Sequence, residues 1–130
     1  MERSADWMSQ AHSDLEHARY ALKGEFFEWA CFSSQQAAEK AAKAVFQRLG
    51  GEAWGHSVSD LLDALAEEHK VPNDLLDAAL ELDKAYIPTR YPDAHQSGTP
   101  RSRYTRTEAE RLVRHAEKIL RFCDDFLSTL

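Results

Sequence analysis

The sequence lacks the features that mark several large classes of protein. Its two cysteines, Cys31 and Cys123, are far apart and each lies in an apolar helical stripe, so we expect no structural disulfide. No apolar run approaches the ~18 residues that a membrane-spanning helix needs. The N-terminal residues contain no basic region followed by an apolar stretch, as a signal peptide would. We therefore expect a cytoplasmic protein with no membrane contact.

Signatures for metals and nucleoside triphosphates are also missing. The chain contains no HExxH, CxxC, GxxxxGK[ST] or GxGxxG motif, and none of its six histidines has another histidine four residues away. The sequence therefore predicts no resident metal and no other cofactor. Any nucleotidyltransferase chemistry would belong to a partner protein.

Helical spacing dominates what is present. Apolar residues recur three and four positions apart in five segments, and no segment alternates with a period of two. We predict an all-α, antiparallel up-and-down helical bundle of four long helices plus a shorter fifth, in a single domain covering 1–130. The expected helices are 5–23, 26–49, 57–69, 74–87 and 107–127, with a long loop at 88–106.

Three local signals support these boundaries. Ser57 followed by Asp60 resembles a capping box at the start of the third helix, and Thr107 with Glu110 has the same spacing at the fifth. Pro88 is expected to end the fourth helix.

Charge is unevenly distributed along a chain whose net charge is −6. Residues 1–85 carry 8 basic against 16 acidic side chains, a net of −8, whereas residues 86–130 carry 8 against 6, a net of +2. The segment from Tyr86 to Arg106 contains a single acid, Asp93, and the arginines Arg90, Arg101, Arg103 and Arg106. This pattern favours contact with an anion or an acidic partner, and a solvated basic loop is the simpler alternative.

Arg90 and His95 are the candidate catalytic pair. The arginine fork suits phosphate, and histidine can exchange a proton near neutral pH, so together they could bind and cleave a phosphodiester without a metal. Phosphate binding without turnover and a purely structural role stay open. In the structural role, Arg90 would bond helix carbonyls, Asp93 or Asp83.

Two other polar sets have simpler interpretations. Gln35, Gln36, Glu39 and Lys40 lie beside an alanine stripe, where a solvated face or a dimer contact is favoured over a groove lining. Gly55-His56-Ser57 begins a helix and could hold an anion, but Ser57 as a plain N-cap is favoured.

Two motifs give the sequence a specific resemblance. They are the run Gln35-Gln36-Ala37-Ala38-Glu39-Lys40 and the run Thr89-Arg90-Tyr91-Pro92-Asp93. With Trp7, Asp14-Leu15 and Gly55-His56-Ser57, they resemble the HEPN domains (higher-eukaryote and prokaryote nucleotide-binding), specifically the small bacterial stand-alone branch. The resemblance covers nearly the whole chain.

This resemblance implies a helical bundle that forms a homodimer and pairs with a minimal nucleotidyltransferase. Many relatives are toxins and metal-independent ribonucleases with an arginine, four to six residues, and a histidine, a spacing that Arg90 and His95 satisfy. Tyr91 stands where those ribonucleases usually have a small polar residue. Ser97 stands where some toxins carry a tyrosine that the partner adenylylates.

The functional hypothesis follows from the residues and the resemblance together. The chain is predicted to be the effector of a toxin–antitoxin-like pair, a metal-independent ribonuclease that uses Arg90 and His95 for catalysis. Tyr91, Arg101, Arg103 and Arg106 are the predicted RNA- or nucleotide-binding residues. The alternative is a non-catalytic module that binds a nucleotide or docks on the nucleotidyltransferase.

Overall fold

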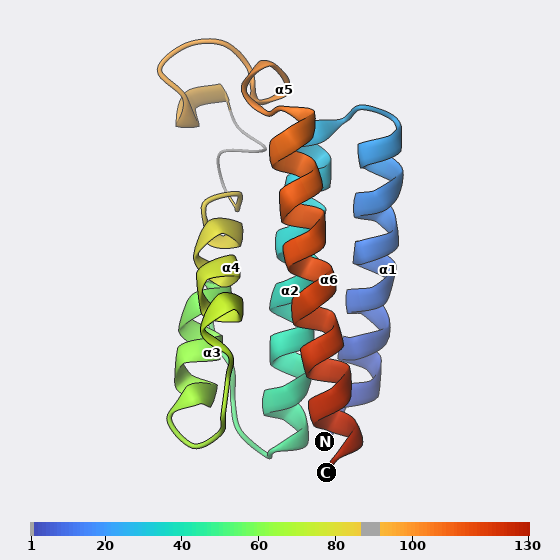
Figure 1. Cartoon of the computed structure of the whole chain (residues 1–130), viewed down its shortest axis with the longest axis vertical. Helices are drawn as coiled ribbons and strands as arrows, with labels where there is room; N and C mark the ends of the chain where they lie inside the picture. The colour runs from blue at the N-terminus through green and yellow to red at the C-terminus, as the bar shows by residue number, and fades with distance from the viewer. Residues whose placement is uncertain (1, 87–91) are drawn as a thin grey trace.

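The computed structural model describes residues 2–86 and 92–130, and every regular element within them is helical (Figure 1). The α-helices are α1 (Ser4–Lys23), α2 (Phe27–Arg48), α3 (Val58–Ala66), α4 (Asn73–Asp83), α5 (Pro100–Arg103) and α6 (Arg106–Ser128). A short 3₁₀ turn, η1, covers Pro92–Ala94. The predicted all-α bundle is confirmed.

Helix α2 is the centre of the bundle. It packs along α1 on one side and α6 on another, and it also contacts α3, α4 and α5. Figure 1 shows the turn between α1 and α2 at the same end of the molecule as α5, while the start of α1 and the end of α6 lie at the opposite end. Helix α5 therefore lies at the end of the bundle where α2 begins.

Small side chains on α2 allow this central position. Ala30, Ala37, Ala41 and Ala44 are completely or almost completely buried, so neighbouring helices can approach the α2 backbone closely. Larger apolar side chains complete the core from the surrounding helices. The bulkiest of these that are fully buried are Leu62, Leu82, Ile119 and Leu120.

Three helices are long, with 20, 22 and 23 residues in α1, α2 and α6. Helix α4 is shorter than predicted, with 11 residues, and ends at Asp83. The next residues, as far as Tyr86, form a tighter turn in which each backbone N–H bonds the carbonyl three residues back. The predicted loop 88–106 is also partly helical, since it contains η1 and α5.

The N-cap predicted for the last helix was wrong by two residues. Thr105, not Thr107, caps α6, because its side chain accepts a hydrogen bond from the backbone N–H of Glu108 at 3.1 Å. Thr105 precedes Glu108 by three residues, the same spacing as Thr107 and Glu110, so the capping-box pattern fits both threonines.

Helix α3 begins as predicted and holds an additional anion. Ser57 accepts from the backbone N–H of Asp60 at 3.1 Å. The Asp83 carboxylate, from the end of α4, accepts from Val58 N at 2.6 Å and Ser59 N at 3.2 Å, and from both serine hydroxyls. A carboxylate at a helix N-terminus is stabilised by the free N–H groups and by the dipole. The predicted pairing of Asp83 with Arg90 lies outside the described residues.

Within the described residues, no helix combines the length and the apolar character that crossing a membrane requires.

Asp83→Ala should lower the free energy of unfolding by about 2 kcal/mol, because it leaves the first donors of α3 without their charged acceptor. Urea denaturation followed by circular dichroism measures this effect. Asp77→Ala, an exposed change in the same helix, is the control and should stay within about 0.5 kcal/mol of wild type. Equal stability of the two variants would contradict the role given to Asp83.

Candidate functional site

His95 is the described member of the predicted catalytic pair. Its side chain is half-buried, and its ring meets the ring of Tyr104 edge to face, with the centroids 6.1 Å apart. Tyr104 in turn packs against the core. Arg90 and Tyr91 lie outside the described residues, so their roles stay predictions.

Helix α5 holds the arginine-rich segment in a defined shape. Thr99 and Ser102 form a reciprocal capping box, and Pro100 occupies the first helical position, where its missing N–H costs nothing. This turn was not predicted, although Thr99-Pro100 with Ser102 three residues after the threonine indicates a capped helix start. Along the chain, this turn carries Arg101 and Arg103 and lies between His95 and the start of α6.

Of the predicted RNA-binding arginines that the structure describes, Arg103 and Arg106 contribute to the fold. Arg103 donates to the backbone oxygen of Ser97 at 2.9 Å and to its hydroxyl at 2.8 Å, which closes the loop before α5. Arg106 forms an ion pair with Glu25 at 2.6 Å and lies over the ring of Phe27. These contacts tie the segment to the turn between α1 and α2.

Arg101 differs from the other two. Its guanidinium lies 4.8 Å from the ring centre of Phe26, and it makes no ion pair or hydrogen bond with another described residue. A guanidinium on an aromatic face keeps its in-plane donors available. Among the described arginines predicted to bind RNA, Arg101 is therefore the one best placed to contact a phosphate.

A charged hollow of about 360 Å³ adjoins Tyr104. It is lined by Glu81, Lys84, Ala85, Tyr104, Glu108, Arg111 and Leu112. Glu81 accepts from His115 at 2.9 Å and from Arg111 at 2.8 Å, and these bonds lower the pKa of Glu81. Lys84 makes no ion pair with another described residue, so it is the cation that this hollow offers to an anion.

Burial keeps one tyrosine and both cysteines protonated. It raises the pKa of Tyr104 to about 12, with further contributions from the negative charges of Glu108 and Cys31. Burial likewise raises the pKa of the Cys31 thiol to about 12 and that of Cys123 in the same direction. Both cysteines are free, as predicted, and both are buried, so neither is a reactive thiolate near neutral pH.

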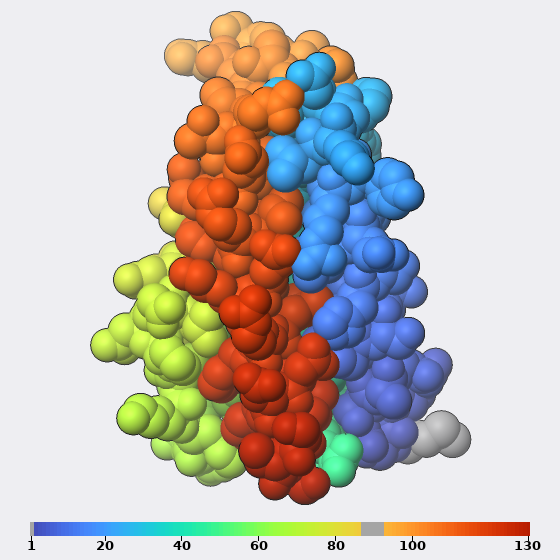
Figure 2. Space-filling view, turned by 45° about the vertical axis from the view of Figure 1, so that its right-hand side comes forward, coloured from blue at the N-terminus to red at the C-terminus, as the bar shows by residue number. Residues whose placement is uncertain are grey.

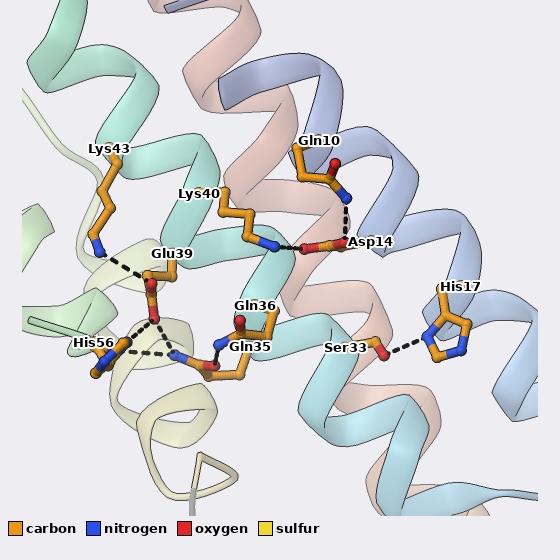
Figure 3. A network of polar contacts seen from close by, with 10 residues as sticks. All are labelled: Gln10, Asp14, His17, Ser33, Gln35, Gln36, Glu39, Lys40, Lys43 and His56. Carbon is orange, nitrogen blue, oxygen red and sulfur yellow. Dashed lines mark hydrogen bonds and ion pairs between the residues drawn. The ribbon is translucent and has the colours of Figure 1, made fainter. Parts of the chain in front are cut away.

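Polar side chains of α2 form a network with His56, in the turn before α3 (Figure 3). Glu39 accepts from Gln35 at 3.2 Å, from Lys43 at 3.1 Å and from the Nδ1 of His56 at 3.1 Å. The Gln35 amide also donates to the backbone oxygen of His56 at 2.9 Å. The imidazole of His56 also stacks on the ring of Tyr86, with the ring centroids 4.5 Å apart.

The interpretation of these α2 residues as a solvated face was therefore wrong for Gln35 and Glu39. Both are buried, and both bond His56 in the turn before α3. Lys40 instead pairs with Asp14 of α1 at 2.6 Å. The network ties His56 and, through stacking, Tyr86 to α2, so it fixes the last described residue before the segment that carries Arg90.

One oxygen of a buried carboxylate on α2 has no hydrogen-bond partner in the described part of the chain. Glu28 is 4% exposed, and its Oε1 has no hydrogen-bond partner among the described residues. It lies one turn before Phe32 and two turns before Gln35, on the face that carries the network. A buried carboxylate oxygen without a donor destabilises the folded state.

Residues 2–86 and 92–130 contain no group of three or more His, Cys, Asp or Glu side chains arranged to hold a metal ion.

Comparison with known proteins identifies the family. The HEPN domain model matches residues 4–126, which is nearly the whole chain. The chain belongs to the HEPN domain family.

Solved structures of related proteins superpose closely on this chain. The protein TT1696 of Thermus thermophilus has a TM-score of 0.92 and 50% identity, covering 96% of this chain and 98% of its own. A HEPN domain protein of Thermotoga maritima has a TM-score of 0.81 and 58% identity, covering 96% and 99%. A candidate toxin of Methanocaldococcus jannaschii is 29% identical over 130 residues, which is 93% of this chain and 86% of the relative.

The raised pKa of Tyr104 predicts a loss of stability at high pH. Because the folded HEPN chain keeps the phenol neutral up to about pH 12, the unfolded chain ionises first, from its ordinary pKa of 10. The contribution of Tyr104 is therefore complete below pH 10 and lost between pH 10 and about 12. In urea denaturation across this window, Tyr104→Phe should show a smaller decline than wild type. Parallel curves would contradict the assignment.

Glu28→Met should raise the free energy of unfolding by about 1 kcal/mol, since methionine has similar length and helix propensity and needs no donor. Thermal and urea unfolding measure the change. Glu16→Met, an exposed change in α1, is the control and should be neutral within about 0.5 kcal/mol. A loss of stability in Glu28→Met would show that the carboxylate stabilises the fold.

Proposed function

We propose that this HEPN chain is the effector of a toxin–antitoxin-like pair and acts on RNA as a metal-independent ribonuclease. The proposal is supported by the similarity to a candidate toxin and by the spacing of Arg90 and His95. Its partner would be a minimal nucleotidyltransferase, and its working form a homodimer.

The observation that carries the proposal is the surroundings of His95. The imidazole is half-buried against Tyr104, which orients the ring. Arg101 follows six positions later in the chain, on α5, and its guanidinium makes no ion pair with another described residue. Phosphodiester cleavage requires at least a proton-transferring group and a cation able to hold phosphate, and this part of the chain supplies both kinds of side chain. Residues 94–107 contain no acid that would repel the RNA backbone.

In this mechanism the RNA supplies its own nucleophile. The ribose 2′-oxygen attacks the adjacent phosphorus as His95 removes its proton, and water protonates the departing 5′-oxygen. In the other assignment water accepts the 2′-proton and His95 protonates the 5′-oxygen. The new bond joins the 2′-oxygen to phosphorus and the broken bond is that to the 5′-oxygen, so the products are a 2′,3′-cyclic phosphate and a 5′-hydroxyl. Arg90 would stabilise the charge on the phosphorane, and the acid–base step contributes about 10²–10⁴ in rate.

A non-catalytic module that binds a nucleotide is the second candidate. It is favoured by the hollow beside Tyr104, where Lys84 offers a cation and Arg111 is held by Glu81. Such a module would bind a nucleotide or the nucleotidyltransferase with the same affinity whichever residue stands at position 95.

The test is cleavage of total RNA and transfer RNA by the purified chain in the presence of EDTA. Wild type should release fragments ending in 2′,3′-cyclic phosphate, and His95→Ala should be at least about 100-fold slower with unchanged circular dichroism. His12→Ala is the matched control, because His12 is exposed and pairs with Asp124.

Cleavage that needs a divalent metal, or that survives in His95→Ala, would contradict the ribonuclease mechanism. A folded wild-type chain that leaves RNA intact would also contradict it and favour the binding module.

A further inference from the structure

An aromatic hollow lies at the end of the bundle that carries α5. It has a volume of about 520 Å³ and forms where the last turns of α1 meet the first turn of α2. Its lining residues are His17, Tyr20, Ala21, Phe26 and Trp29. Tyr20, Phe26 and Trp29 are 76%, 48% and 44% exposed. Three large aromatic side chains on one small surface exceed what the packing of the bundle needs.

The charge beside the hollow is positive. Arg101 lies on the Phe26 ring that lines it, and Arg106 lies over the neighbouring Phe27, 5.1 Å from the ring centre. Arg106 is neutralised by Glu25, whereas Arg101 makes no ion pair with another described residue. Figure 2 shows the light-blue atoms of the α1–α2 turn next to the orange atoms of the α5 segment. An apolar surface therefore borders an available cation.

A hydrogen-bonding group completes the surface. The Nδ1 of His17 is 2.6 Å from the hydroxyl of Ser33, and this contact fixes the orientation of the ring (Figure 3). The other ring nitrogen, Nε2, makes no hydrogen bond with another described residue and can bond the edge of a base.

Two sets of neighbouring residues link the hollow to the proposed catalytic region. On one side, Arg101 belongs to α5, which is followed directly by Tyr104, the residue that contacts His95. On the other side, Trp29 meets Phe32 edge to face at 6.0 Å, and Phe32 meets Tyr86 at 6.2 Å. Tyr86 is the last described residue before the segment that contains Arg90.

We infer that this hollow is a subsite for unpaired bases of single-stranded RNA, with Tyr20, Phe26 and Trp29 as stacking surfaces and Arg101 as the phosphate contact. Aromatic faces next to a cation are how proteins bind single strands with little sequence preference. Duplex RNA does not fit, since its bases are already stacked and its groove offers no free base face. The inference rests on the proposed function for the choice of RNA.

Binding is measured with a dye-labelled, 2′-O-methylated single strand of about ten nucleotides, which the chain cannot cleave because the nucleophilic hydroxyl is blocked. Tyr20→Ala and Trp29→Ala should each weaken binding about 5-fold to 100-fold. Trp54→Ala is the matched control, because Trp54 is 80% exposed and lies outside the hollow.

Arg101→Gln should weaken binding and lower the slope of affinity against salt by about one, as expected for one lost phosphate contact. Arg114→Gln, an exposed change on α6, should leave both unchanged. The same RNA annealed to its complement should bind at least about tenfold more weakly than the single strand.

Several results would overturn the subsite. These are absence of binding by wild type, equal binding of duplex and single strand, and equal effects of Trp29→Ala and Trp54→Ala. A fall in mass on sedimentation that accompanies the loss of binding in Tyr20→Ala or Trp29→Ala would assign the hollow to a second copy of the chain. Hollow-dependent binding without cleavage of ordinary RNA would keep the subsite and reject the ribonuclease mechanism. Cleavage of ordinary RNA that these variants leave unchanged would keep the ribonuclease mechanism and reject the subsite.

Discussion

Close packing around α2 is the constraint on which the rest of the structure depends. Its buried alanines let α1 and α6 approach its backbone, so the long helix becomes the axis of the bundle. A central helix has few positions left that face water. Polar side chains on it must therefore form hydrogen bonds inside the protein. Gln35 bonds Glu39 and the backbone oxygen of His56, and Glu39 also bonds Lys43 and the His56 ring.

The contacts of Glu39 also hold the end of the α4 segment in place. His56 is held by Glu39 and stacks on Tyr86, which fixes the end of the α4 segment against α2. From the other direction, Arg106 attaches the start of α6, which directly follows the α5 segment, to Glu25 in the turn before α2 and to Phe27, its first residue. The chain between these two attachments contains both Arg90 and His95. The predicted catalytic pair thus lies in a segment that α2 anchors at both ends.

Much of the fold could be predicted from local patterns, because helical spacing and capping residues act over a few positions. Ser57 was identified as a cap from its neighbours alone. Thr105 was missed because Thr105 and Thr107 each precede a glutamate by three residues, so the local pattern fits both of them. The burial of Glu39 depends on His56, 17 residues away, and no local pattern reports that contact. Of the predicted site, His95 and three arginines lie around α5, and only the structure shows that Arg103 and Arg106 serve the fold.

The central claim is that the end of the bundle with α5 is the RNA-binding end. Backbone amide NMR spectra of the full chain, recorded with and without a methylated single-stranded RNA, test it most directly. The largest shifts are expected at His95, Arg101 and Tyr104 and in the turn between α1 and α2, with none near Leu130. Shifts centred on the opposite end, where α6 finishes, would contradict it.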